Sequence, residues 1–211
     1  MGKSSAQLSR NIGVAALIAA VSIGCGTFET KKKGRKAQQN AMELAGEWRS
    51  NCVKLDWLGL QYSVESYAFT AIGDFDKKTT VFSDEGCATA SAELVQRGTY
   101  DELGGSKEVQ GAKDINFTVV EAGLAPKDAR LLAPMNAALY CGHNDWAVNV
   151  AQTIIDRDCG GKTTRRGQVI FDLYQVADKT LHFGDTMMFF NKSNPAQRPN
   201  KLDAGRTFTK K

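Results

Sequence analysis

Short runs in which apolar and polar residues alternate dominate the chain from Gly46 onward. In "QYSVESYAF", Tyr62 and Val64 alternate with Ser63 and Glu65, and comparable runs are "KKTTVF", "ELVQRGTY", "KDINFTVV", "WAVNVAQTII", "GQVIFDLYQV" and "KTLHF". A period of two is typical of β-strands with one buried face. The pattern therefore predicts roughly eight short strands in residues 44–211.

Turn residues between these runs predict antiparallel neighbours. The segment "VIFDLYQVADKTLHFGD" is predicted to form a hairpin whose turn is built on Asp178 and Lys179. A series of such strands indicates an antiparallel barrel or sandwich. We favour a barrel, because closure removes the exposed sheet edges through which proteins aggregate.

One segment, "APKDARLLAPMNAALYCG", has the pattern of a helix. Pro126 and Asp128 suit a helix start, and Leu132 and Met135 share one face. Pro134 is expected to shorten or kink the helix, because proline cannot donate to the helical hydrogen-bond ladder. The fold class predicted is thus mostly β, with one short helix.

The first 24 residues have the layout of a secretory signal. Lys3 and Arg10 form a charged start, and Ile12 to Ile23 form an apolar core that is too short to span a bilayer comfortably. Residues 1–24 are therefore predicted to be a signal peptide of the lipoprotein type, residues 25–43 a basic flexible tether, and residues 44–211 the barrel domain.

Cys25 follows this apolar core directly. The sequence "SIGC" resembles a lipobox, with a small residue, Gly24, before the cysteine. The resemblance implies lipid attachment at Cys25, and Gly26 in the next position implies delivery to the bacterial outer membrane, facing the periplasm or the surface. We therefore expect the protein to be attached to a membrane through an N-terminal lipid anchor.

Net charge argues against a nucleic-acid partner. The chain carries +4 overall, but residues 25–43 alone hold five basic residues against two acidic ones. Residues 44–211 contain 20 Lys and Arg against 21 Asp and Glu. The barrel domain therefore lacks the general positive charge that phosphate backbones require, and its one compact basic cluster, Lys162 with Arg165 and Arg166, suits a solvated turn.

Four cysteines remain after Cys25, and export predicts that they are oxidised. Four cysteines permit three pairings, and the sequence does not choose among them. We favour Cys52 with Cys87 and Cys141 with Cys159, because each bond closes a loop within one predicted sheet region.

Candidate chemistry is sparse. "CGHND" places Cys141, His143 and Asp145 at alternate positions, and Cys159 would be a fourth ligand of a zinc site, but the spacing matches no zinc signature and exported cysteines usually pair. No nucleophile with an adjacent base, glycosidase carboxylate pair or phosphate-binding glycine loop is recognisable. We therefore expect no enzyme activity, no metal and no cofactor.

Aromatic residues are spread along the predicted strands. Most are expected to form the core, and the remainder to line an apolar pocket inside the barrel. The residues concerned are Trp57, Tyr62, Tyr67, Phe69, Phe75, Phe82, Phe117, Trp146, Phe171, Phe183, Phe189 and Phe190.

Two resemblances to known families support a barrel. The "GEW" of "GEWRSNC" resembles the Gly-x-Trp on the first strand of lipocalins, in which an arginine from near the end of the barrel packs on the tryptophan. The resemblance implies a lipocalin-like antiparallel barrel closed by Trp48 with Arg206.

A longer pattern consists of "GEWRSNC", "YAFT", "VFSDEGC" and "RGTY", followed by "MNAALYCGHNDWAV". It resembles the adenomatosis-polyposis-coli-down-regulated domain over most of residues 44–160. That resemblance implies a lipocalin-like barrel with an apolar cavity, which in the animal proteins binds a lipidated partner.

The leading hypothesis is an exported, lipid-anchored barrel that binds a lipid or acyl chain in the bacterial envelope. Its alternative is an envelope structural or interaction lipoprotein whose barrel is filled by its own aromatic side chains. An enzyme of unknown class is a third hypothesis.

Overall fold

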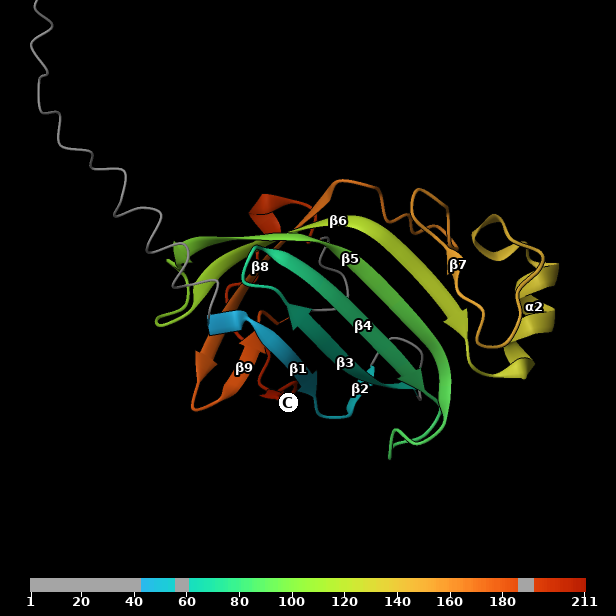
Figure 1. Cartoon of the computed structure of the whole chain (residues 1–211), viewed down its shortest axis with the longest axis horizontal. Coiled ribbons are helices and arrows are strands. Elements are labelled where there is room, and N and C mark those ends of the chain that lie inside the picture. Colours follow the sequence, from blue (N-terminus) through green and yellow to red (C-terminus); the bar gives the residue numbers. More distant parts are fainter. Residues whose placement is uncertain (1–42, 56–60, 186–191) are drawn as a thin grey trace, which may run out of the picture.

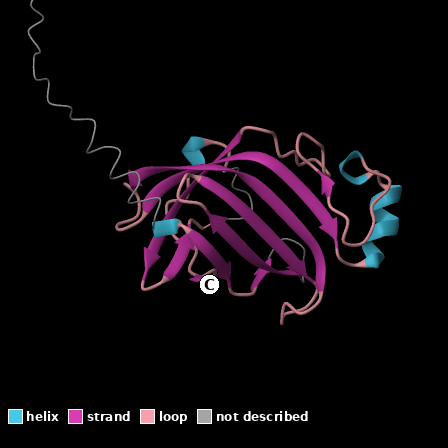
Figure 2. Ribbon diagram, in the orientation of Figure 1, coloured by secondary structure: helices cyan, strands magenta, loops and turns pink. Residues whose placement is uncertain are grey.

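The computed structural model describes residues 43–55, 61–185 and 192–211. The predicted signal peptide, Cys25 and nearly all of the predicted tether lie outside these residues, as do Trp57, Phe189 and Phe190. Strands dominate the described part, and the helices are short and peripheral (Figure 2). The strands are Gly46–Ser50 (β1), Val53–Leu55 (β2), Gln61–Phe69 (β3), Asp74–Phe82 (β4), Ala90–Gly105 (β5), Lys113–Pro126 (β6), Gln152–Thr153 (β7), Gln168–Ala177 (β8), Thr180–Phe183 (β9) and Phe208–Lys210 (β10).

The sheet closes on itself into a barrel. Its strand order is β1-β10-β9-β8-β6-β5-β4-β3, and β1 also pairs with β3, so that the eight strands form a complete ring of antiparallel neighbours. The closing register places Trp48 opposite Tyr67 on one side and opposite Lys210 on the other. The predicted antiparallel barrel is therefore confirmed.

The two ends of the barrel differ in their connections. Short turns join β3 to β4, β5 to β6 and β8 to β9, and the first described residues, Glu43 and Leu44, lie at this same end, because Gly46 pairs with Phe69 beside the β3–β4 turn. We call it the short-turn end. The connections β1–β3, β4–β5, β6–β8 and β9–β10 all lie at the opposite, long-loop end.

The predicted hairpin of β8 and β9 is confirmed. Val176 pairs with Leu181, and Ala177 with Thr180, so that Asp178 and Lys179 form a two-residue turn. Both turn residues have positive φ, 49° and 65°. Two residues of positive φ are the geometry of a type I′ turn, whose twist matches that of the flanking strands.

The predicted helical segment is only partly helical. Pro126 ends β6 rather than starting a helix, and Asp128 instead caps the 3₁₀ helix Ala129–Leu131 (η1), where its carboxylate accepts a hydrogen bond from the Arg130 amide at 2.9 Å. The α-helix Leu132–Ala137 (α2) follows, and then the 3₁₀ helix Tyr140–Gly142 (η2). A further 3₁₀ helix, Pro195–Gln197 (η3), lies between β9 and β10.

The segment "WAVNVAQTII" is not the strand that its pattern predicts. Only β7 is extended, pairing with the end of β6. The Asn136 side chain instead fixes Trp146, accepting a hydrogen bond from the Trp146 amide at 2.7 Å, and Asn149 turns the chain with a φ of 63°. We call residues 127–167 the insert: its helices lie beyond the end of β6 in Figure 1, and from β7 on it runs back beside β6.

Candidate functional site

The barrel interior is divided into two halves of different chemistry. Side chains alternate across a strand, so the buried Ser63, Tyr67 and Phe69 show that Glu65 between them also faces inward. The pairing of β3 with β4 places Lys77 beside Tyr67 and Thr79 beside Glu65 on that same inner surface. The inner surface can therefore be followed strand by strand around the barrel.

The half toward the short-turn end is filled by aromatic rings, and we call it the aromatic half. Tyr67 stacks on Phe69 with ring centroids 5.3 Å apart and lies 4.9 Å from Phe183. Phe75 meets Phe117 edge-to-face at 5.0 Å. Such contacts fill space efficiently, and these rings are nearly inaccessible to solvent. The aromatic half consists of Trp48, Tyr67, Phe69, Phe75, Tyr100, Phe117, Phe183 and Phe208.

The half toward the long-loop end carries ionic groups, and we call it the charged half. One carboxylate oxygen of Glu65 lies 3.1 Å from the Lys77 ammonium, and the other lies 2.8 Å from the Arg206 guanidinium. Arg206 also donates to the Ser63 hydroxyl at 3.0 Å. One carboxylate thus compensates two cations.

A second ion pair lies in the same half. Asp172 of β8 pairs with Lys192 at 2.6 Å and accepts hydrogen bonds from the amides of Leu173 and Gly184. Lys192 also donates to the Gly184 carbonyl at 3.5 Å. These neighbours give Asp172 a nearly complete set of partners, although the residue is only 4% exposed.

The pKa shifts show that the ionic groups act on one another. Burial alone would raise the pKa of Glu65, but Lys77 and Arg206, with a smaller contribution from Lys192, hold it below its usual value. Burial, followed by the negative charges of Glu65 and Asp172, raises the pKa of Tyr67 well above its usual value. Glu65 is therefore ionised at neutral pH, and Tyr67 is neutral.

The charged half keeps contact with solvent, unlike the aromatic half. The side chains of Glu65, Lys77, Arg206 and Lys192 are 18%, 22%, 12% and 15% exposed. The inward-facing apolar side chains here are only partly buried, and they belong to β5, β6 and β8: Leu94, Leu124 and Ile170. Cations and aliphatic groups that share one inner surface and are partly accessible to solvent can accommodate an amphipathic molecule.

A different ionic group lies at the short-turn end. Lys113 pairs with Glu43, and both carboxylate oxygens of Glu102 are buried without a hydrogen-bond partner among the described residues. Burial raises the pKa of Glu102, and burial together with Glu102 raises that of Tyr174. Burial thus shifts the titration of the Glu102 carboxyl group upward from its usual pKa.

Both favoured disulfides are confirmed. Cys52 is bonded to Cys87, where it ties the β1–β3 connection to the β4–β5 loop, and Cys141 is bonded to Cys159 within the insert. The residues of the candidate zinc cluster are accordingly committed elsewhere: the two cysteines are joined, and His143 bonds through Nε2 to the Thr153 carbonyl at 2.9 Å. Within the described ranges no group of three His, Cys, Asp or Glu side chains could hold a metal ion.

Trp48 and Arg206 both lie in the barrel, with separate partners. Trp48 is 1% exposed, donates from its indole nitrogen to the Leu44 carbonyl at 2.7 Å, and has the Lys210 ammonium 5.3 Å from its ring centroid. Arg206 is held by Glu65 and Ser63 as described above. The contact of Trp48 with Arg206 stays a prediction.

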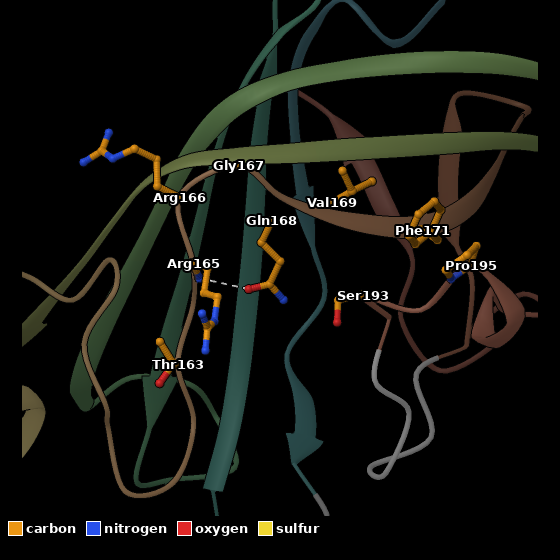
Figure 3. Close-up of a pocket in the computed structure, with 9 residues that line it drawn as sticks. All are labelled: Thr163, Arg165, Arg166, Gly167, Gln168, Val169, Phe171, Ser193 and Pro195. Carbon is orange, nitrogen blue, oxygen red and sulfur yellow. Dashed lines mark hydrogen bonds between the residues drawn. The ribbon is translucent and has the colours of Figure 1, made fainter.

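A hollow lies outside the barrel, against the outer face of β8. Its volume is about 610 Å³, and Figure 3 shows Val169, Phe171 and Pro195 on one side and Arg165 with Gln168 on the other. The Gln168 side chain accepts from the Arg165 amide at 3.0 Å, whereas Arg166 points away from the hollow. Both arginines are exposed on a turn, as their sequence context predicts.

Comparison with models of protein families and with curated proteins finds no match to this chain. The resemblance to the adenomatosis-polyposis-coli-down-regulated domain therefore depends on its motifs alone. In the part of the chain that the structure describes, no helix has the length and apolar character needed to cross a membrane.

Of the charged half, only Arg206 is predicted from the sequence as a site residue, and there as the partner of Trp48. Glu65 and Lys77 are charged residues at strand positions that the alternation assigns to the inner face. A charge at such a position is the one sequence signal that could have identified them. Asp172, Lys192 and Arg206 come together with them only when the ring of strands closes, through the pairing of β1 with both β3 and β10. The aromatic residues that the sequence assigns to the core and to a pocket lie, where the structure describes them, in the aromatic half or outside the barrel interior.

Proposed function

We propose that this protein is an exported, lipid-anchored barrel that binds a hydrophobic ligand, a lipid or acyl chain, in the bacterial envelope. The barrel fold and the oxidised cysteines are consistent with such a protein. The ligand, the anchor and the location are proposals that the following observations support.

One observation carries the ligand proposal: the inner surface is filled over the aromatic half but remains partly exposed over the charged half. A purely structural barrel gains most by filling its interior with apolar side chains, since burying a charge is costly. Here Glu65, Lys77, Arg206, Asp172 and Lys192 take positions that apolar residues could fill. Retaining charged groups beside partly exposed Leu94 and Leu124 is readily explained by ligand binding.

Titration with a neutral fluorescent probe for apolar sites, N-phenyl-1-naphthylamine, tests this proposal. The oxidised mature protein should bind the probe with micromolar affinity. A Thr79→Trp variant, which places a large ring on the inner surface opposite Glu65, should weaken binding at least tenfold. Lys78→Trp is the matched control, because it puts the same ring on the outer face of the same strand, where the Lys78 side chain is 49% exposed.

The outcome of this titration also decides between ligand binding and the structural alternative. If the wild-type protein fails to bind the probe, or if both tryptophan variants bind as well as wild type, the charged half is not a ligand site. A barrel that supports other envelope proteins would then be the better hypothesis.

The anchor proposal depends on cysteine pairing and on where the chain enters the barrel. The four cysteines of the barrel domain are paired with one another, so none of them is available as a disulfide partner for Cys25. Glu43 and Leu44 lie at the short-turn end, opposite the end toward which the proposed ligand site faces.

Detergent phase partitioning tests the anchor. Wild-type protein expressed with its leader should enter the detergent phase, and a Cys25→Ser variant should move to the aqueous phase or keep an uncleaved leader. Equal partitioning of the two proteins, with the same mature N-terminus, would rule out acylation at Cys25.

A further inference from the structure

The charges of the charged half do not balance. Three cations, Lys77, Lys192 and Arg206, face two carboxylates, Glu65 and Asp172, so these described groups carry one surplus positive charge. A mostly desolvated cation without a counter-ion is unfavourable, because the interior replaces water poorly as a partner for charge. A bound anion would therefore neutralise the surplus positive charge.

The surplus can be assigned to one place. The Asp172–Lys192 pair is neutral by itself, and Asp172 is completed by two backbone amides. Glu65, in contrast, divides its two oxygens between Lys77 at 3.1 Å and Arg206 at 2.8 Å. The surplus positive charge therefore belongs to Lys77 and Arg206.

The surroundings of these two cations define the shape of a complementary molecule. On the side of the short-turn end they meet the aromatic half, where Lys77 lies 5.2 Å from the centroid of the Tyr67 ring and the space is already occupied. On the side of the long-loop end the inner surface continues through the half-buried Leu94, Leu124 and Ile170. A molecule that reaches the cations must therefore extend toward the long-loop end.

We propose that the ligand is a fatty acid, or an amphiphile with the same single carboxylate, bound with its carboxylate between Lys77 and Arg206 and its chain along Leu94, Leu124 and Ile170. This inference rests on the proposed function and adds the headgroup and the orientation. One carboxylate cancels the surplus charge, and both lysine and arginine form strong charge-assisted hydrogen bonds to carboxylates. An amine headgroup would increase the surplus, and an alcohol would leave it unchanged.

Competition between matched ligands tests the headgroup. Dodecanoic acid and 1-dodecanol have the same chain, and each is titrated against protein-bound N-phenyl-1-naphthylamine at pH 7.5 and low salt, below the concentration at which it aggregates. The wild-type protein should bind the acid about tenfold or more tightly than the alcohol, as one charge-assisted contact provides. Lys77→Met should reduce that preference to less than about threefold, mainly by weakening binding of the acid.

Lys78→Met is the control variant, since Lys78 lies on the outer face of the same strand and should leave the preference intact. Equal affinity of the wild-type protein for acid and alcohol would overturn the headgroup inference, as would an unchanged preference in Lys77→Met. The wild-type comparison needs no variant, so it decides even if Lys77→Met does not fold. Failure of the probe itself to bind would instead contradict the proposed function.

Discussion

The ion group around Glu65 makes the stability of the barrel sensitive to one carboxylate. In a Glu65→Gln variant the side chain keeps its size, but Lys77 and Arg206 lose their shared anion. Both cations are largely buried, with side chains 22% and 12% exposed, so solvent compensates them poorly. Removing one partner from a buried ionic group typically costs 3–5 kcal/mol, and because the amide retains a hydrogen-bonding oxygen we expect a loss of about 3 kcal/mol.

The loss should depend on pH in a defined direction. The pKa of Glu65 in the folded protein is lowered from its usual value of 4.5. A lowered pKa means that the ionised group stabilises the fold fully above the unfolded-state pKa, and that this contribution disappears as pH falls through the folded-state pKa. The difference between wild type and Glu65→Gln should therefore be complete at pH 7 and shrink below about pH 4.

Urea denaturation of the oxidised proteins, followed by tryptophan fluorescence at pH 7 and pH 3.5, measures both effects. Glu47→Gln is the control: Glu47 pairs with Lys211 at 3.6 Å but is 65% exposed, so its loss should change stability by less than about 0.5 kcal/mol. A double variant, Glu65→Gln with Lys77→Met, should recover part of the loss because it removes one uncompensated cation. A Glu65→Gln protein as stable as wild type at pH 7, or equally destabilised at both pH values, would refute this account of the charged half.

Three further predictions concern the barrel and its insert. A Gly98→Ala variant should lose at least about 2 kcal/mol in urea denaturation, because a Cβ at this bulge would lie 1.9 Å from the Thr118 carbonyl oxygen; a wild-type midpoint would refute the close approach. Replacing Cys141 and Cys159 by serine should lower the free energy of unfolding by about 3 kcal/mol, as expected for a disulfide loop of 18 residues. If the insert is stabilised separately from the barrel, the same variant should bind the probe within twofold of wild type. Glu102→Gln should raise the denaturation midpoint more at pH 8 than at pH 3.5, since burial raises the pKa of Glu102 from its usual 4.5 and the folded state therefore loses stability as pH rises past the unfolded-state pKa; an equal change at both pH values would contradict it.

The sequence predicts the barrel because its strands carry strong local signals. The alternation around Val64 and the Asp178–Lys179 turn are properties of neighbouring residues, and the structure keeps both. Both predicted disulfides form, but only Cys52–Cys87 joins connections of paired strands; Cys141–Cys159 closes a loop of the insert and not of a sheet region. The insert is predicted less well, because the Asn136 side chain and the positive φ of Asn149 override the strand pattern of "WAVNVAQTII".

The charged half could not be predicted in the same way. Glu65 and Lys77 are separated by one hairpin, but Asp172, Lys192 and Arg206 join them only after the ring of strands has closed. No local pattern specifies which charged residues of distant strands share an interior. The prediction that aromatic residues form much of the core is correct. Their concentration at one end of the barrel depends on strand register, which alternation alone leaves open.

The central claim is that an acyl chain occupies the charged half of the barrel, and the contacts of a bound ligand test it most directly. We would label the Leu and Ile methyl groups of the otherwise deuterated protein and measure intermolecular nuclear Overhauser effects to the chain protons of dodecanoic acid. The account predicts contacts to the methyl groups of Leu94, Leu124 and Ile170. Contacts confined to exposed side chains such as Leu103 and Leu139, which are 57% and 58% exposed, would contradict it.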